Sequence, residues 1–303
     1  MVRTPSTHGS CGDLKAQMPL NDSEFQRYLK LLDLRREKPS ITALTRIVRQ
    51  HLITIPFENI SKLYRLKTVG LRRMPDLARY LEGIEQFHFG GTCYANNYFL
   101  HTLLRHLGYD ADLCGADMSR PDVHIVNVVR VEGREFVVDA GYGAPFLEPL
   151  PRDLAVDFVV NQGDDRYVLR PTSEGGGSEM LLFRNGTFAH GYRVNPRGRQ
   201  IEEFEKVVAD SFLPEATFMN AILLVRFLAD GSLVLHNMQY SEIRGTTTKR
   251  VVLDSFHQVV RTIEVAFGIP AGPVKVALEG LSLTSDAWGG PGPTTTQSSG
   301  ENT

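Results

Sequence analysis

The stretch over residues 90–108, Gly-Gly-Thr-Cys-Tyr-Ala-Asn-Asn-Tyr-Phe-Leu-His-Thr-Leu-Leu-Arg-His-Leu-Gly, divides the chain into a helical part and a strand-rich part. After the two glycines, leucines recur at the three- and four-residue spacing of one helical face. Gly108 is a favourable helix stop. We therefore predict a helix that begins near Thr92 and ends just before Gly108.

The sequence before residue 90 predicts further helices. Asn21 stands three residues before Glu24, a weak form of the capping box, and apolar residues follow at helical spacing. Ser40 can cap a second helix, which Pro56 would end. A third short helix is expected over residues 76–81.

After Gly108 the pattern changes to short runs rich in Val and Ile between Gly, Pro and Asp, which predicts strands. The expected strands cover residues 114–118, 124–131, 134–139, 166–169, 180–183, 187–194, 220–227 and 232–236. Glu132-Gly133 and Asn185-Gly186 are two-residue hairpin signals. A last helix is expected from Asp254 or Ser255 to Gly268. Segregated helices and strands indicate an α+β protein.

Length and composition are those of an ordinary globular protein. The chain has 303 residues, 42% of them hydrophobic and 22% charged, and its net charge is −2. These values exclude a disordered chain and a strong attraction to nucleic acid or to an acidic membrane. No apolar run approaches the length of a membrane-spanning helix.

The cysteines and the polar start of the chain bear on the cellular compartment of the protein. Cys11, Cys93 and Cys114 are odd in number and far apart, and the polar start does not resemble a signal peptide. We therefore expect no disulfide framework and a reducing, cytoplasmic location. CxxC and HExxH patterns are absent, so no metal ion is expected. Residues 1–20 are expected to be a flexible N-terminus and residues 289–303 a disordered tail.

Cys93 is the candidate nucleophile. The predicted helix places it in the first turn, where free backbone amides and the helix dipole favour a thiolate. Gly90 and Gly91 allow a sharp turn and a close backbone approach before it. The alternative is that Cys93 is a small buried hydrophobic residue. Cys114 lies inside a predicted strand and Cys11 in the polar start, so neither has this setting.

A predicted hairpin brings His124 close to Asp139. With Glu132-Gly133 as its loop, Val126 faces Asp139, and His124 points to the same side as Val126 because side chains alternate along a strand. His124 and Asp139 are then diagonal neighbours within side-chain reach. A carboxylate beside an imidazole fixes its tautomer and favours the imidazolium. The alternative is a structural strand histidine and a turn-forming aspartate.

Cysteine, histidine and aspartate in this chain order indicate a thiol acyltransferase or hydrolase. Papain-like and transglutaminase-like enzymes share a cysteine on a helix and a His/Asp pair on a sheet. Spacing alone does not choose between them.

Several segments together resemble the arylamine N-acetyltransferase family. They are Ile55-Pro56-Phe57-Glu58-Asn59-Ile60, Gly90-Gly91-Thr92-Cys93-Tyr94-Ala95-Asn96-Asn97, His124-Ile125-Val126-Asn127, Val138-Asp139-Ala140-Gly141-Tyr142-Gly143, and residues 212–236 with Phe218, Asn220 and Asp230-Gly231. The first is similar to the family's PFEN segment, the second to its R-G-G-x-C-x-x-x-N motif and the fourth to its V-D-x-G-F-G motif. The segments stand in the family's order over residues 22–285.

The resemblance implies three parts and a ping-pong reaction. The parts are a helical bundle over residues 21–110, an antiparallel β-barrel over residues 111–215 and a small α/β lid over residues 216–288. Cys93 would take an acetyl group from acetyl-CoA as a thioester, with His124 as acid and base and Asp139 as its orienting partner. The acetyl group would pass to an arylamine, an arylhydrazine or an N-hydroxyarylamine.

The resemblance also implies a substrate site. Phe57, Tyr142 and Phe218 match positions that line the acceptor pocket, and Gly143 would lie beside the coenzyme. Flat apolar walls suit an aromatic amine. Each of the three aromatic residues is equally compatible with plain core packing. The expected partners are the small aromatic amine and coenzyme A, without nucleic acid or membrane.

Two positions depart from the family pattern. Phe89 stands where the family has the arginine before Gly-Gly, so Glu58 of the PFEN segment lacks its expected cation, and a buried carboxylate needs another partner or water. The candidate cations are Arg72, Arg73 and Arg79. Tyr142 replaces the commoner phenylalanine and adds a hydroxyl at the pocket.

Three other functions compete with acetyl transfer. An amide synthase of the same family would close macrolactams, and its sequence feature would be the lid and loops such as residues 175–178. A thiol peptidase or transglutaminase-like enzyme would use the same three residues. A catalytically silent scaffold would bind a small aromatic molecule without reaction.

Overall fold

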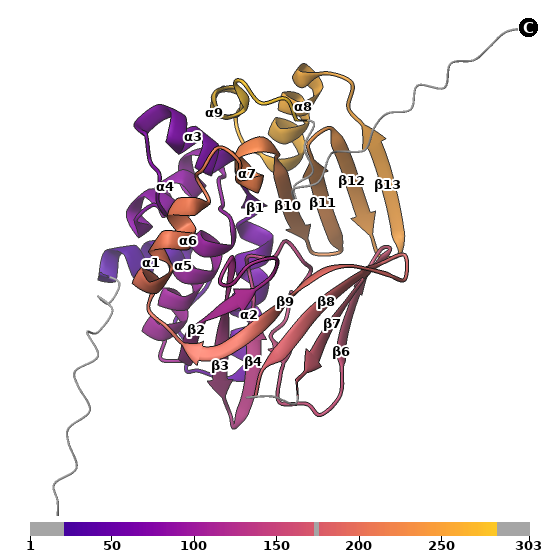
Figure 1. The fold of residues 1–303 in the computed structure, drawn as a ribbon. Helices are drawn as coiled ribbons and strands as arrows, with labels where there is room; N and C mark the ends of the chain where they lie inside the picture. Colours follow the sequence, from indigo (N-terminus) through magenta and orange to yellow (C-terminus); the bar gives the residue numbers. More distant parts are fainter. Residues whose placement is uncertain (1–20, 173–175, 284–303) are drawn as a thin grey trace, which may run out of the picture.

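The computed structural model describes residues 21–172 and 176–283 (Figure 1). The expected flexible N-terminus over residues 1–20 and the expected tail over residues 289–303 lie outside the described residues, as do Cys11 and Gly175.

Helices occupy the first third of the described chain. They are α1 (Asp22–Leu31), α2 (Ile41–Thr54), α3 (Ile60–Val69), α4 (Leu77–Phe87) and α5 (Cys93–His106). The two predicted caps are confirmed: the Asn21 side chain accepts the backbone N–H of Glu24 at 2.9 Å, and Ser40 Oγ accepts that of Ala43 at 3.1 Å. Helix α3 was not predicted; the Glu58 carboxylate accepts the Ser61 N–H of its first turn at 2.8 Å, whereas the Asn59 side chain does not cap it.

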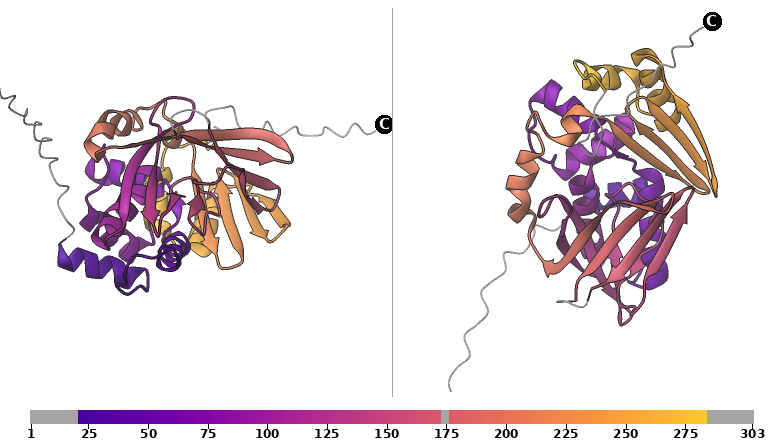
Figure 2. Two further views of the ribbon diagram at one scale, coloured as in Figure 1. Left: turned by 90° about the horizontal axis from the view of Figure 1, so that it is seen from below. Right: turned by 45° about the vertical axis from the view of Figure 1, so that its right-hand side comes forward.

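The middle of the chain forms an antiparallel sheet that curves into a nearly closed barrel (Figure 2). Its strands are β2 (Asp110–Asp117), β3 (His124–Val131), β4 (Arg134–Val138), β5 (Leu150–Pro151), β6 (Phe158–Gln162), β7 (Asp165–Pro171), β8 (Ser178–Arg184) and β9 (Thr187–Gly198). The strand order is β5-β4-β3-β2-β9-β8-β7-β6. Val131 faces Arg134 across the β3–β4 turn, so the register predicted from Glu132-Gly133 is confirmed.

A second sheet follows, connected to the first by short helices. The connection contains η1 (Ile201–Phe204), α6 (Glu205–Asp210) and α7 (Thr217–Asn220). The sheet consists of β1 (Phe57–Glu58), β10 (Leu223–Leu228), β11 (Gly231–His236), β12 (Gln239–Arg244) and β13 (Thr247–Val252), in that order. Helices α8 (Phe256–Thr262), η2 (Ile263–Phe267) and α9 (Ala271–Leu278) lie beside it (Figure 1).

Two parts of the second sheet differ from the sequence prediction. The strand expected over residues 220–227 begins only at Leu223, because residues 217–220 form α7 and the Asn220 amide donates to the carbonyls of Pro214 and Ala216. Strands β12 and β13 were not predicted. Their side chains are mostly polar, half-buried in β12 and mostly exposed in β13, so the two strands lack the apolar alternation that marks a strand.

The buried cores connect these parts and support the predicted α+β class. One core lies between α1, α2, α4, α5 and the strands β3, β4 and β10. A second joins α3, α8 and α9 to β10 and β11, and a third fills the barrel. Helix α5 packs against β2 and β3, which places its first turn beside the start of β3. Within the described ranges, the helices are all too short or too polar to cross a membrane.

Candidate active site

Cys93 begins helix α5, as the sequence predicts. Its side chain is 9% exposed, and its Sγ lies 3.8 Å from the carbonyl oxygen of Val123, just before β3. The backbone after Asp139 packs directly on this first turn: a Cβ at Gly141 would lie 2.5 Å from Cα of Cys93. Only glycine at position 141 permits this approach, so the helix start and the end of β4 are held in one fixed arrangement.

The structure brings His124 and Asp139 into direct contact. Nε2 of His124 lies 2.9 Å from Oδ2 of Asp139, and both side chains are buried. Three further donors reach the carboxylate. Asn97 Nδ2 and the backbone N–H of Gly141 donate to Oδ1 at 2.9 and 2.8 Å, and the Tyr192 hydroxyl donates to Oδ2 at 2.7 Å. Such hydrogen bonding favours the ionised form of a buried carboxylate.

The electrostatics of this pair favour an imidazolium beside the thiol. Burial alone would lower the pKa of His124, but the Asp139 charge and hydrogen bond, together with the Cys93 side chain, raise it to about 10. Burial alone would raise the pKa of Asp139, but His124, Asn97 and the Gly141 amide hold it below its ordinary value. At neutral pH the site therefore contains a carboxylate, an imidazolium and a cysteine in contact.

Asn97 and Tyr192 are two members of this network that were not among the predicted site residues. Asn97 Nδ2 also donates to the Ile125 carbonyl at 2.6 Å, and its Oδ1 accepts the Ala140 N–H at 2.7 Å. Asn97 is the asparagine of the G-G-x-C-x-x-x-N segment, four positions after Cys93 and therefore on the same helical face, so the sequence contained a signal for it. Tyr192 comes from β9, far along the chain, and nothing local in the sequence pairs it with Asp139.

Two of the predicted pocket residues contact each other. The rings of Phe57 and Phe218 meet edge to face, with centroids 5.8 Å apart. Phe57 is buried, whereas Phe218 is half-buried and lines a cavity of about 490 Å³, which Val123 also lines. Gly143 has φ of +73° and lies against Phe57, as its missing Cβ would be 3.8 Å from that ring.

Tyr142 packs against the catalytic candidate His124. Its ring centroid is 5.7 Å from that of His124, and its hydroxyl forms a 2.6 Å hydrogen bond with Nδ1 of His190. His190 lines the same 490 Å³ cavity as Phe218. The extra hydroxyl, which distinguishes this chain from the commoner phenylalanine, therefore holds a histidine at the wall of that cavity.

The cation near Glu58 is Arg65. Glu58 accepts the N–H groups of Gly90 and Ser61 at 2.9 and 2.8 Å. Burial lowers the pKa of Arg65 and the Glu58 charge opposes this, while the guanidinium lies 5.6 Å from the centre of the Phe89 ring. The candidates Arg72, Arg73 and Arg79 did not include it, because Arg65 lies on the unpredicted helix α3. Arg79 pairs with Asp76 instead.

A cysteine at a helix start with a His–Asp pair on an antiparallel sheet defines the papain-like class of thiol enzyme folds. A sequence model described as N-acetyltransferase matches residues 40–274, more than half of the chain. The chain belongs to the arylamine N-acetyltransferase family, whose members are acyltransferases.

Individual relatives agree with this assignment. The arylamine N-acetyltransferase pineal gland isozyme NAT-3 of Gallus gallus is 32% identical over 126 residues, which are 39% of this chain and 42% of that protein. The chain thus matches less than half the length of that relative. The structure of the arylamine N-acetyltransferase from Mycobacterium abscessus superposes with a TM-score of 0.71 at 21% identity, covering 84% of this chain and 93% of that one. The Mycobacterium marinum enzyme in complex with CoA gives 0.70 at 21% identity, covering 84% and 98%.

Proposed function

We propose that this protein transfers an acetyl group from acetyl-CoA to an arylamine, an arylhydrazine or an N-hydroxyarylamine through a thioester on Cys93. The observation that carries the proposal is the 2.9 Å contact between His124 and Asp139 beside the helix-start cysteine. Family membership and the CoA complex of a structural relative support the choice of donor.

In the first half-reaction the Cys93 thiolate attacks the carbonyl carbon of the acetyl thioester. The new bond joins Sγ to the acetyl carbon, the bond from that carbon to the CoA sulfur breaks, and the imidazolium of His124 gives its proton to the departing thiolate. Asp139 stays ionised and keeps the ring oriented throughout. Free CoA leaves, and a neutral His124 faces the thioester.

In the second half-reaction the amine nitrogen attacks the thioester carbon. His124 takes the proton that the amine loses, the bond to Sγ breaks, and the thiolate and imidazolium are restored. We place the aromatic ring of the acceptor against Phe57, Tyr142 and Phe218, since flat apolar walls bind a neutral aromatic amine and exclude water. Gly143, which has no side chain, would leave room for the coenzyme beside them. A free nucleophilic thiol requires a reducing compartment, so we propose that the reaction takes place in the cytoplasm.

Mass spectrometry of the acylated enzyme tests the proposal. After brief incubation with acetyl-CoA we expect one acetyl group on the peptide that contains Cys93, and its loss with release of free CoA when an arylamine is added. Cys93→Ala should show neither. Cys114→Ala is the matched control and should retain both, because burial raises the pKa of the Cys114 thiol to about 12 and keeps it unreactive. Full CoA release by Cys93→Ala would exclude this mechanism.

A further inference from the structure

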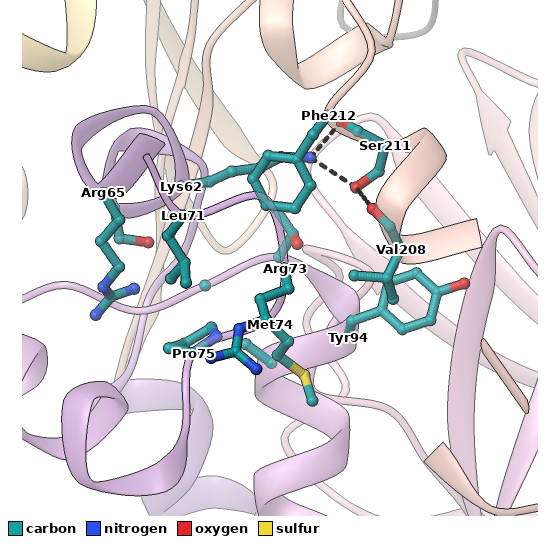
Figure 3. Close-up of a pocket in the computed structure, with 14 residues that line it drawn as sticks. Lys62, Arg65, Leu71, Arg73, Met74, Pro75, Tyr94, Val208, Ser211 and Phe212 are labelled. Carbon is teal, nitrogen blue, oxygen red and sulfur yellow. Dashed lines mark hydrogen bonds between the residues drawn. The ribbon is translucent and has the colours of Figure 1, made fainter. Parts of the chain in front are cut away.

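A small cavity with basic walls adjoins the first turn of α5. It has a volume of about 50 Å³, and Thr92 and Tyr94, the chain neighbours of Cys93, contribute to its lining. Figure 3 shows Tyr94 among the lining residues. Lys62, Arg65 and Arg73 are the basic residues among its walls, and none of the residues that line it is acidic. The cavity therefore has a positive potential that its own lining does not neutralise.

Lys62 is the basic residue of this cavity whose charge interacts with that of Cys93. Its Nζ donates to the backbone oxygen and to Oγ of Ser211, at 2.5 and 2.9 Å, and lies 4.2 Å from the centre of the Phe212 ring (Figure 3). All these partners are neutral, and an ammonium has three N–H donors, so one donor is left over. Across residues 21–172 and 176–283, no carboxylate lies within ion-pair distance of Lys62.

The charge state of Lys62 agrees with this position. Burial lowers the pKa of its ammonium to about 8, while a negative charge on Cys93 acts in the opposite direction. Lys62 is thus near enough to Cys93 for their charges to interact. Lys62 is half-buried, and a partly desolvated cation without an anionic partner is unfavourable, so an anion that completes it would be bound strongly.

Arg73 adds a second uncompensated charge. Arg65 faces the charge of Glu58, but in the described part of the chain Arg73 has neither an ion pair nor a hydrogen bond. Arg73 was a candidate partner for Glu58, and the structure instead places it among the residues that line the cavity, with an exposed side chain.

The small cavity and the larger one share lining residues, which brings Lys62 close to the surroundings of Cys93. Lys62, Tyr94 and Ser211 line both the 50 Å³ cavity and the 490 Å³ cavity. Val123, whose carbonyl oxygen contacts Sγ of Cys93, lines the larger one. An acyl group on Cys93 therefore has the ammonium of Lys62 within its surroundings. The smaller cavity exceeds the roughly 10–15 Å³ that one bound water molecule needs, so it has room for a small polar group such as a carboxylate.

We propose that Lys62 and Arg73 form a subsite for a carboxylate at the far end of the acyl group, so that the enzyme accepts monoacyl thioesters of short dicarboxylic acids such as malonyl-CoA and succinyl-CoA. The inference rests on the proposed function, because the acyl group must first be carried by Cys93. The bonds that form and break are those of acetyl transfer. The remote carboxylate is bound by charge-assisted hydrogen bonds and is unchanged by the reaction.

Malonyl-CoA and acetoacetyl-CoA make the sharpest comparison, since the two acyl groups have the same shape and differ in the negative charge. We expect kcat/KM for thiol release to be higher with malonyl-CoA. Lys62→Met should lower the ratio of the two kcat/KM values by about tenfold, the size of one charge-assisted hydrogen bond. Arg73→Gln, at an exposed position that tolerates change, should lower it in the same direction.

Two neighbouring cations serve as controls. Lys67→Met changes a lysine on the same helix α3, and Arg72→Gln changes the arginine next to Arg73; neither residue lines the cavity, so both variants should keep the wild-type ratio. An equal ratio in wild type, Lys62→Met and Arg73→Gln would overturn the proposal.

The phosphates of coenzyme A are the other anions that a basic cavity could bind. Malonyl and acetoacetyl thioesters of N-acetylcysteamine contain no phosphate, so the preference for malonyl should persist with them. If Lys62→Met weakens both CoA donors equally and leaves the N-acetylcysteamine thioesters unaffected, the cavity binds phosphate and the acyl subsite is wrong. Absence of any Cys93 adduct with acetyl-CoA would defeat the proposed function itself, whereas an acetyl adduct without a preference for charge defeats the subsite alone.

Discussion

Each oxygen of the Asp139 carboxylate has two partners inside the protein. Oδ1 accepts from Asn97 and from the Gly141 backbone, and Oδ2 accepts from Tyr192 and contacts His124. A buried carboxylate without such donors would take up a proton. At the residue scale, these donors keep the negative charge that in turn keeps His124 protonated.

The raised pKa of His124 predicts a pH dependence of stability. The ordinary histidine value is 6.5 and the folded value about 10, so the folded state binds the proton more tightly than the unfolded chain. This stabilisation is complete below about pH 6.5 and is lost as pH rises towards 10. We expect Tm to fall over that range more steeply in wild type than in His124→Asn. Parallel Tm curves, recorded by calorimetry from pH 6 to 10, would contradict the prediction.

Asn97→Ala should weaken both stability and acylation. The substitution leaves the Ala140 N–H and the Ile125 carbonyl without their partner and removes one donor from Asp139. We expect a loss of about 2–4 kcal/mol in the free energy of unfolding, measured in urea, since each unpaired buried group costs roughly 1–3 kcal/mol.

The adjacent Asn96 provides the matched control for Asn97→Ala. Asn96 is also buried, and its amide donates to the Pro56 and Ala140 carbonyls at 3.3 and 3.4 Å. No hydrogen bond joins it to Asp139 among the described residues. Asn96→Ala should therefore lose stability with a smaller loss in the rate of Cys93 acylation. Equal acylation rates in the two variants would show that Asn97 acts only through stability.

At the scale of elements, helix starts and the β3–β4 turn depend on local chemistry. Ser40 has extended backbone angles, and its Oγ accepts a hydrogen bond from the Ala43 N–H, which has no acceptor within the helix. Helix α2, which it caps, contributes buried residues to the core beside α5. The cap thus supports the packing that fixes the start of α5.

Ser40→Ala should lower the free energy of unfolding by about 1 kcal/mol, the usual cost of losing an N-cap. Ser40→Thr should restore most of it, because the hydroxyl is retained. The urea midpoint of the two variants measures the difference, and an unchanged midpoint in Ser40→Ala would show that water replaces the cap without cost.

The features that could be predicted from the sequence are those with local causes. The Asn21 and Ser40 caps and the Glu132-Gly133 turn each depend on residues within four positions, and the structure agrees with all of them. Helix α3, which was missed, begins after a residue with non-local contacts, because the Asn59 side chain bonds to residues beyond position 217 and not to its own helix. Tyr192 contacts Asp139 and Ser211 contacts Lys62 from elements far along the chain, and no local pattern indicates such contacts.

At the scale of the molecule, Asn59 joins the helical part to the second sheet. Its Nδ2 donates to the carbonyls of Phe218 and Ala221 at 3.0 and 2.8 Å, and its Oδ1 accepts the Leu223 N–H at 3.0 Å. The side chain is fully buried, and its bonds to Ala221 and Leu223 are buried, whereas the bond to Phe218 is part-buried. One residue of the PFEN segment therefore fixes the start of β10 relative to α3.

Asn59→Ala should destabilise the protein by about 3 kcal/mol, because two buried backbone groups and one part-buried carbonyl lose their partner. Arg250→Ala is the contrast: Arg250 pairs with Asp164 at 2.6 Å and links the two sheets, but both side chains are exposed. An exposed ion pair contributes roughly 0–1 kcal/mol. Urea unfolding compares the two variants, and similar losses in both would refute this account of the connection.

Strand β1 covers β10 with only two residues, Phe57 opposite Val225 and Glu58 opposite Leu224. Those two residues precede the barrel in the chain, although their partners follow it. A proteolytic fragment that begins at β2 would expose the backbone amides and carbonyls of β10 as an open edge. Such a fragment would pair with further copies of itself and aggregate, so truncation of the N-terminal part costs solubility as well as Cys93.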